Sequence, residues 1–192
     1  MGFDLYGLNP SNQTVPDCNY EDEETVAAYF TWQSNTQGAY FRQTVWGWKP
    51  LWSYVMKSCS DIISVEDAER GWFNDGHQID KEKAIRIAKR IRHLKKNGQL
   101  SDYAYTYKEH MDSLPDEEEW QGWKSEDEWL KYHDKLESGG PGGYKWAKKC
   151  KGCNGCIGKG KQKHYEKSYS FEEEEVLEFA EFCENSGGFK IC

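Results

Sequence analysis

The stretch of residues 39–59, AYFRQTVWGWKPLWSYVMKSC, decides the fold, because six aromatic residues fall within it. Its first part is predicted to be extended, and Pro50 suits the first turn of a helix that follows. Apolar residues then recur at helical spacing until Cys59 and give this helix one apolar face. These residues are Leu51, Trp52, Val55 and Met56. A strand that leads into a core helix is therefore expected.

Large rings rather than aliphatic side chains are expected to fill the core. The chain has 192 residues, of which 37% are hydrophobic, and it holds 9 Trp and 12 Tyr. A chain of this length can bury a core of its own, and bulky aromatic side chains supply much buried area each. The predicted aromatic centre consists of Tyr40, Phe41, Trp46, Trp48, Pro50 and Trp52. The alternative is a ligand pocket lined by Tyr40, Trp46, Trp52 and His77.

Strand and helix signals flank this centre on both sides. Residues 3–6 form a predicted strand, and residues 21–32 form either a short helix or an irregular acidic segment. The clearest helix covers 81–96, with Asp80 as its N-cap and Asn97-Gly98 at its end. Further helices are predicted over 101–114, 125–136 and 170–184. The last two have capping boxes, at Ser125/Glu128 and Ser170/Glu173. A final strand is predicted over 189–192. The expected fold class is α+β, predominantly α-helical, with short N- and C-terminal strands.

A glycine-rich linker, Ser138-Gly-Gly-Pro-Gly-Gly143, divides the chain. It predicts a helical body with an aromatic core over 1–137 and a small module rich in Gly, Lys and Cys over 138–167. Residues 168–192 are expected to supply a C-terminal helix and strand that pack on the body. One domain overall is the expectation, since chains of this length are usually one domain.

The net charge of −8 conceals alternating blocks of opposite sign. Residues 80–97 carry a net charge of +6 and residues 144–167 carry +7, whereas the other parts of the chain are acidic. Overall acidity argues against a general nucleic-acid coat. The basic blocks either form a local anion-binding face or neutralise neighbouring acidic blocks.

The second basic block contains the cysteine cluster C150-KGCNGCIGKG-160. Thiolates spaced C-x-x-C-x-x-C among glycines suit a zinc ion, which takes four tetrahedral ligands in structural sites. The candidate zinc ligands are Cys150, Cys153, Cys156, His164, Cys183 and Cys192. A homodimer that completes the site across two chains is a further possibility. An iron–sulfur cluster is less favoured, because the C-x-x-x-C-P continuation is missing, and a loop of reduced thiols without metal is the third interpretation.

Lysines and aromatic residues are interleaved around these cysteines, a combination that can bind phosphates and stack on bases. The predicted nucleic-acid contacts are Lys148, Lys149, Lys159, Lys161, Lys163 and Trp146. The alternative is that the lysines only keep a loop solvated. Among the histidines, His77 follows the turn Asn74-Asp75-Gly76 and is the one candidate for a histidine-dependent reaction. No phosphate loop or nucleophile motif is present, so no catalytic residue is assigned.

Several stretches resemble a family of small phage and prophage proteins. They are the opening MGFDLYGLNP, residues 38–52 (GAYFRQTVWGWKPLW), Asn74-Asp75-Gly76 and the closing residues 181–192 (EFCENSGGFKIC). Within the cysteine module, Cys153 to Gly160 reads C-x-x-C-x-G-x-G and resembles a zinc knuckle of the DnaJ-type chaperones. Such knuckles come in pairs, and this chain has one. The resemblance implies a phage origin and no particular reaction.

The function expected from these features is that of a phage accessory protein. No apolar run approaches the about 20 residues of a membrane span, and the N-terminus lacks the pattern of a signal peptide. A cytoplasmic location in a bacterial host is expected, without a membrane partner. The leading hypothesis is a non-enzymatic protein with a zinc-knuckle element that binds a partner through its lysine-rich module, and nucleic acid is one candidate for that partner. The alternatives are an inhibitor that binds a host protein or small ligand, and a metal- or histidine-dependent enzyme.

Overall fold

The computed structural model describes residues 2–119 and 161–192. It divides into two compact units, of which the first comprises Met1–Lys108 and Tyr169–Cys192 and the second Glu109–Ser168. The described residues form helices and a small antiparallel sheet, so the predicted α+β class with a mostly helical content is confirmed. The helix predicted over 125–136 and the boundary predicted after residue 137 lie outside the described residues.

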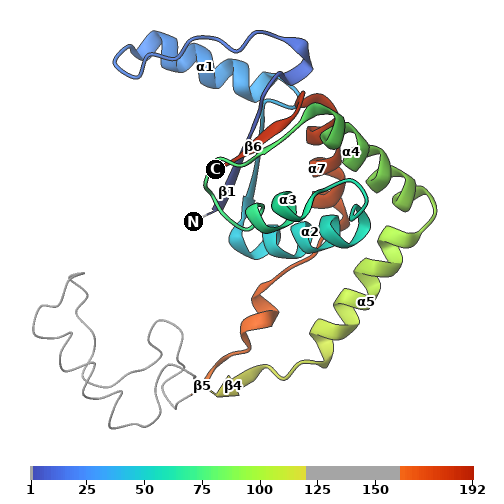
Figure 1. The fold of residues 1–192 in the computed structure, drawn as a ribbon. Coiled ribbons are helices and arrows are strands. Elements are labelled where there is room, and N and C mark those ends of the chain that lie inside the picture. Colours follow the sequence, from blue (N-terminus) through green and yellow to red (C-terminus); the bar gives the residue numbers. More distant parts are fainter. Residues whose placement is uncertain (1, 120–160) are drawn as a thin grey trace, which may run out of the picture. The chain divides into compact units, whose positions relative to one another are not determined.

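A four-stranded antiparallel sheet forms one side of the first unit (Figure 1). Its strands are β1 (Gly2–Gly7), β2 (Tyr40–Thr44), β3 (Gln78–Ile79) and β6 (Phe189–Ile191), in the order β2-β1-β6-β3. Leu5 of β1 lies opposite Phe41 on one side and Ile191 on the other. The strands predicted at the two ends of the chain are therefore both present, and they pair with each other.

The sheet is amphipathic, because successive side chains of a strand point to opposite faces. Phe3, Leu5 and Phe41 are buried together with Phe189 and Ile191, while the residues between them are more exposed. The helices α2, α4 and α7 all lie on the same side of the sheet in Figure 1. One sheet face and these helices therefore enclose the hydrophobic core.

Helix α2 (Val45–Ser58) follows β2 without a loop. The Thr44 hydroxyl accepts a hydrogen bond from the Gly47 amide at 3.1 Å and so caps the helix at this point. Pro50 lies inside the helix rather than in its first turn, so the predicted start was about one turn too late. The reason is that Thr44 provides a side-chain cap six residues before Pro50.

The core is centred on two stacked indoles of α2. The rings of Trp48 and Trp52 lie 5.3 Å apart at 15°, and neither side chain is accessible to solvent. Phe41 and Pro50 are also buried, which confirms four members of the predicted aromatic centre. Trp46 is 43% exposed and Tyr40 is only partly buried, so these two were wrongly assigned to it.

Five further helices complete the first unit: α1 (Glu23–Asn35), α3 (Val65–Arg70), α4 (Lys81–Lys96), α5 (Gln99–Ser113, which continues into the second unit) and α7 (Glu173–Asn185). Helix α4 confirms its prediction, and the Asp80 carboxylate accepts a hydrogen bond from the Lys83 amide at 2.8 Å. Helix α7 begins after Glu172 and has no side-chain cap, so its predicted capping box was wrong. Ion pairs join α4 to α7, including Arg92 to Glu184 at 2.8 Å.

The described part of the second unit contains two short strands and a 3-10 helix. Strand β4 (Glu117–Glu119) pairs antiparallel with β5 (Lys161–Lys163), and the 3-10 helix covers Tyr165–Ser168. Each lysine of β5 lies opposite a glutamate of β4.

Candidate functional site

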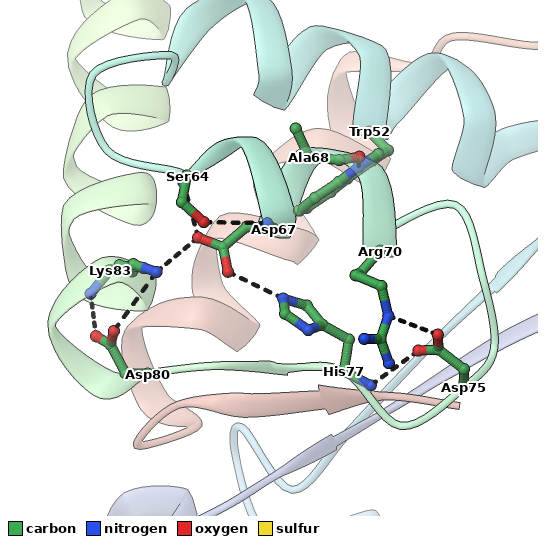
Figure 2. A network of polar contacts seen from close by, with 9 residues as sticks. All are labelled: Trp52, Ser64, Asp67, Ala68, Arg70, Asp75, His77, Asp80 and Lys83. Carbon is green, nitrogen blue, oxygen red and sulfur yellow. Dashed lines mark hydrogen bonds and ion pairs between the residues drawn. The ribbon is translucent and has the colours of Figure 1, made fainter.

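The strongest polar cluster among the described residues is centred on Asp67 of α3 (Figure 2). Ser64 precedes the helix and forms a capping box with Asp67: the Ser64 amide donates to the Asp67 carboxylate at 2.8 Å, and the Asp67 amide donates to the Ser64 hydroxyl at 3.1 Å. Asp67 is only 3% exposed. A carboxylate at this depth requires partners, because removal from water disfavours its charge.

Two side chains from other elements satisfy this carboxylate. The Lys83 ammonium, from the first turn of α4, lies 2.6 Å from Oδ2, and Nε2 of His77 lies 2.9 Å from Oδ1. Burial by itself raises the pKa of Asp67, but the hydrogen bonds from Lys83, Ser64 and His77 outweigh it and lower the pKa to about 2. Asp67 is therefore ionised at neutral pH, and its hydrogen bond raises the pKa of Lys83.

The turn before β3 aims His77 at Asp67. Gly76 has a φ of +86°, which favours glycine, and the Asp75 carboxylate accepts hydrogen bonds from the His77 amide at 3.2 Å and from Nε of Arg70 at 2.7 Å. The Asn74 side chain donates to the Gly2 carbonyl at 2.9 Å and ties the turn to β1. The turn predicted at 74–76 is thus confirmed.

A carboxylate bound to a histidine is the arrangement that orients a general base in many enzymes. Here Lys83 already neutralises Asp67, and within the described residues no hydroxyl or thiol is hydrogen-bonded to the His77 ring. Besides capping its own helix through Ser64, the Asp67 carboxylate joins α3 to α4 through Lys83 and to the turn at 74–77 through His77. The arrangement is therefore structural: Asp67 connects α3, α4 and the turn at 74–77, and we call it the Asp67 hub.

The four residues of the predicted pocket have different neighbours. Trp52 and His77 both contact α3: Nε1 of Trp52 donates to the Ala68 carbonyl at 3.1 Å, and His77 contacts Asp67. The Trp46 ring packs against Tyr169 at 5.1 Å, and the Tyr40 hydroxyl bonds Asp4 on the opposite sheet face. The structure thus brings Trp52 and His77 to the same helix, whereas Trp46 and Tyr40 have other neighbours.

The predicted metal ligands are divided between the two units. Cys183 lies in the core of the first unit with no exposed surface, and burial raises the pKa of its thiol well above the usual value. The amide and carbonyl of Cys192 pair with Asp4 in the same unit. His164 belongs to the second unit, and Cys150, Cys153 and Cys156 lie outside the described residues. In the ranges that the structure describes, no three His, Cys, Asp or Glu side chains are grouped to hold a metal.

The two ring nitrogens of His164 have different surroundings. Its Nε2 lies 3.6 Å from the Glu118 carboxylate, and its amide donates to the Asp116 carbonyl at 3.0 Å. Its Nδ1 is buried, and no hydrogen-bond partner is found for it in the part of the chain that is described. Histidines that bind metals commonly have one nitrogen near a carboxylate and the other on the ion. His164 therefore fits a zinc ligand.

The described end of the lysine-rich block is paired with acids. Lys163 lies opposite Glu117 in the β4–β5 ladder, Lys161 lies opposite Glu119, and the Lys167 ammonium lies 2.7 Å from the Asp116 carboxylate. The ion pair of Lys167 favours neutralisation of the neighbouring acidic block over an open anion-binding face at this position. The predicted contacts Trp146, Lys148, Lys149 and Lys159 lie outside the described residues.

A second candidate site is the segment of residues 8–38, which we name the β1–β2 excursion. Strands β1 and β2 are antiparallel neighbours, and the Gly7 amide bonds the Ala39 carbonyl at 3.0 Å, so a short turn would be enough to join them. The chain instead makes a long detour that contains α1 (Figure 1). No residue of the excursion belongs to the hydrophobic core cluster, and α1 has no buried residue.

The excursion exposes acidic and apolar side chains together. It holds five acids and no Lys, Arg or His, and the first cationic side chain of the whole sequence is Arg42. The described residues include nine large hydrophobic side chains that are exposed, and four of them lie in the excursion. These four are Leu8, Val15, Tyr20 and Phe30. The sequence predicted only a short helix or an irregular acidic segment here, and the absence of any cation before Arg42 is the signal that could have marked this surface.

Hydrogen bonds fix the part of the excursion that carries Tyr20. The Asn19 amide donates to the Thr25 hydroxyl at 3.1 Å, and the Asn19 carbonyl accepts from the Asp22 amide at 2.9 Å. Asp22 caps α1 by accepting from the Glu24 amide at 3.0 Å. Tyr20 is 83% exposed on this turn, although the backbone around it is well ordered by these bonds.

No family model matches the chain, and no curated protein and no solved structure is similar enough to count as a match. Along the described ranges 2–119 and 161–192, every helix is too short or too polar to cross a bilayer.

Proposed function

We propose that the chain is a non-enzymatic binding protein, of the phage accessory kind that its resemblance implies, and that the β1–β2 excursion is its working surface. The observation that carries this proposal is the exposed position of the excursion outside the core, between two strands that need no such detour. Long connections of this kind in compact domains are usually functional or disordered, and helix α1 with its hydrogen-bonded turn argues for function.

A host protein is the partner that the charge distribution favours. The first unit contains 21 acidic and 14 basic residues, and none of the cations lies in the excursion. Such a surface repels phosphate backbones. Nucleic-acid binding through Lys148, Lys149, Lys159 and Lys161 is the competing proposal, and the ion pair between Lys167 and Asp116 weakens it.

Capture of partners from a bacterial lysate separates these two proposals. Three chains serve as bait: the parent, a Tyr20→Ser/Phe30→Ser variant, and a variant with Lys148, Lys149, Lys159 and Lys161 changed to Gln. We expect one protein to bind the parent and the lysine variant in stoichiometric amounts and to be lost from the aromatic variant. A partner that is lost from the lysine variant and removed by nuclease or high salt would replace this proposal with nucleic-acid binding.

We also propose a zinc ion in the second unit, with thiolates of the Cys150–Cys156 cluster and Nδ1 of His164 as its ligands. The buried, unpartnered Nδ1 supports His164 over Cys183, whose thiol lies in the core of the other unit. Such an ion would hold the module together as a structural element.

Metal analysis after purification without chelator tests this second proposal. We expect one zinc ion per chain. The Cys183→Ala variant should keep this zinc content, and the His164→Asn variant should have a lower content or none. The control is His110→Asn, because His110 is exposed and lies 3.4 Å from Glu166. Zinc that is retained by His164→Asn but lost from Cys183→Ala would reverse the ligand assignment.

A further inference from the structure

The chemistry of the excursion identifies the kind of partner it fits. We propose that residues 15–32 bind a segment of another protein that is rich in lysine or arginine and also presents apolar side chains. This inference rests on the proposed function and specifies the partner. It is carried by three features of the excursion: its uncompensated charge, its exposed rings and the fixed geometry of its turn.

The charge of the excursion has no counterpart nearby. Glu21, Glu23 and Glu24 are exposed, and no ion pair among the described residues includes them, Asp17 or Asp22. Acids in the first turn do stabilise α1 through its dipole. That role accounts for Glu23 and Glu24, but Asp17 and Glu21 precede the helix. A cationic partner would therefore meet several charges that the fold itself does not neutralise.

Aromatic rings lie along the same segment. The ring of Tyr29 contacts Phe30 edge-on at 5.6 Å and Trp32 at 5.9 Å, and Phe30 is 51% exposed. Exposed aromatic faces attract lysine and arginine through cation–π contacts and also bury apolar surface. The indole nitrogen of Trp32 is buried without a hydrogen-bond partner among the described residues. Because these aromatic rings lie in the same segment as the acidic residues, the segment suits a basic peptide better than a purely apolar one.

The turn is organised before a partner arrives. The hydrogen bonds among Asn19, Asp22 and Thr25 fix the backbone of the turn that carries the exposed Tyr20, so ordering this backbone costs little on binding. At its base the excursion is tied to the C-terminal end of α7, because the Gln37 side chain bonds Glu181 at 3.1 Å and the Leu8 amide bonds the Gly188 carbonyl at 2.8 Å. A pre-organised aromatic anchor of this kind is typical of interface hot spots.

Isothermal titration of the full chain with two peptides tests this inference. The first is an amphipathic peptide of lysine and leucine, and the second has every lysine replaced by glutamate. We expect the basic peptide to bind, with an affinity that falls as salt rises, and the acidic peptide not to bind. A Glu21→Gln/Glu23→Gln/Glu24→Gln variant should bind the basic peptide at least tenfold more weakly, and Phe30→Ser should also weaken binding.

The matched control changes three exposed acids elsewhere, Glu172→Gln/Glu174→Gln/Glu178→Gln, which alters the net charge by the same amount. It should change the affinity less than twofold; an equal loss would overturn the inference, as would equal binding of both peptides. If neither peptide binds while the Tyr20/Phe30 variant still loses its captured host protein, this inference fails and the proposed function stands. Circular dichroism of each variant confirms that α1 is retained.

Discussion

At the scale of single residues, Asp67 has the largest structural role in the described chain. It is buried, ionised and bonded to Ser64, His77 and Lys83, which belong to three different segments. Removing one member of a buried charge pair leaves the other uncompensated and costs about 3 kcal/mol or more. We expect Asp67→Ala to lower the free energy of unfolding by about this amount in urea titrations.

Asp75→Asn is the control for this substitution, because Asp75 is exposed and its contact with Arg70 lies at the surface. Exposed ion pairs contribute about 0–1 kcal/mol, so a small change is expected. If Asp67→Ala and Asp75→Asn lowered the free energy of unfolding equally, this would contradict the structural role assigned to Asp67.

The same carboxylate predicts how stability depends on pH. Because the folded-state pKa of Asp67 is lowered from 3.8 to about 2, its contribution is complete above the unfolded-state pKa and disappears as pH falls through the folded-state pKa. We expect about 2 kcal/mol of stability to be lost between about pH 5 and pH 2 through this group. In Asp67→Asn this part of the acid dependence should be absent, and an unchanged acid dependence would contradict the lowered pKa.

Two core cysteines give a chemical test of burial. Desolvation raises the pKa of Cys59 to about 12 and that of Cys183 well above the usual value, and neither thiol is accessible. Only the thiolate reacts with iodoacetamide, so both should stay unmodified in the native chain and react after denaturation. Cys18 is partly exposed and is the comparison site. Native-state modification of Cys183 at the rate of Cys18 would contradict its place in the core.

At the scale of elements, the indole pair of α2 connects this helix to α3. Nε1 of Trp48 donates to the Gly71 carbonyl at 2.8 Å, and Nε1 of Trp52 donates to the Ala68 carbonyl. Trp48→Phe removes ring volume and one buried donor, and we expect a loss of about 2 kcal/mol in thermal or urea unfolding. Trp46→Phe is the control on the same helix, since Trp46 is 43% exposed, and it should cost less than half as much.

The elements that the sequence predicted well are those whose signals are local. Helix α4 has its cap, its apolar stripe and its terminal glycine within one stretch, and Gly98 adopts the expected positive φ of 77°. Pro50 misled the prediction for α2, because a proline tolerated inside a helix resembles one that starts it. The capping box predicted at Ser170 and Glu173 is absent, because α7 begins two residues later than expected. Glu172, rather than Ser170, is the residue before its first turn.

At the scale of the whole molecule, the decisive features are non-local. The contact between His77 and Asp67 depends on how the turn at 74–77 is placed against α3. Neither the periodicity nor the spacing of residues in the sequence predicts this contact. The excursion could be recognised only after β1 and β2 were known to be neighbours. Its acidic, cation-free composition was present in the sequence, but composition alone does not say whether a segment is buried in the fold or exposed outside it.

Hydrogen–deuterium exchange on the intact chain, alone and with its captured host protein, tests the central claim most directly. The account predicts that added protection is concentrated in residues 15–32, whereas core segments such as α2 and α7 are protected in both samples. Added protection at the turn of residues 74–77 or in residues 161–167, with none in 15–32, would contradict the assignment of the β1–β2 excursion as the working surface.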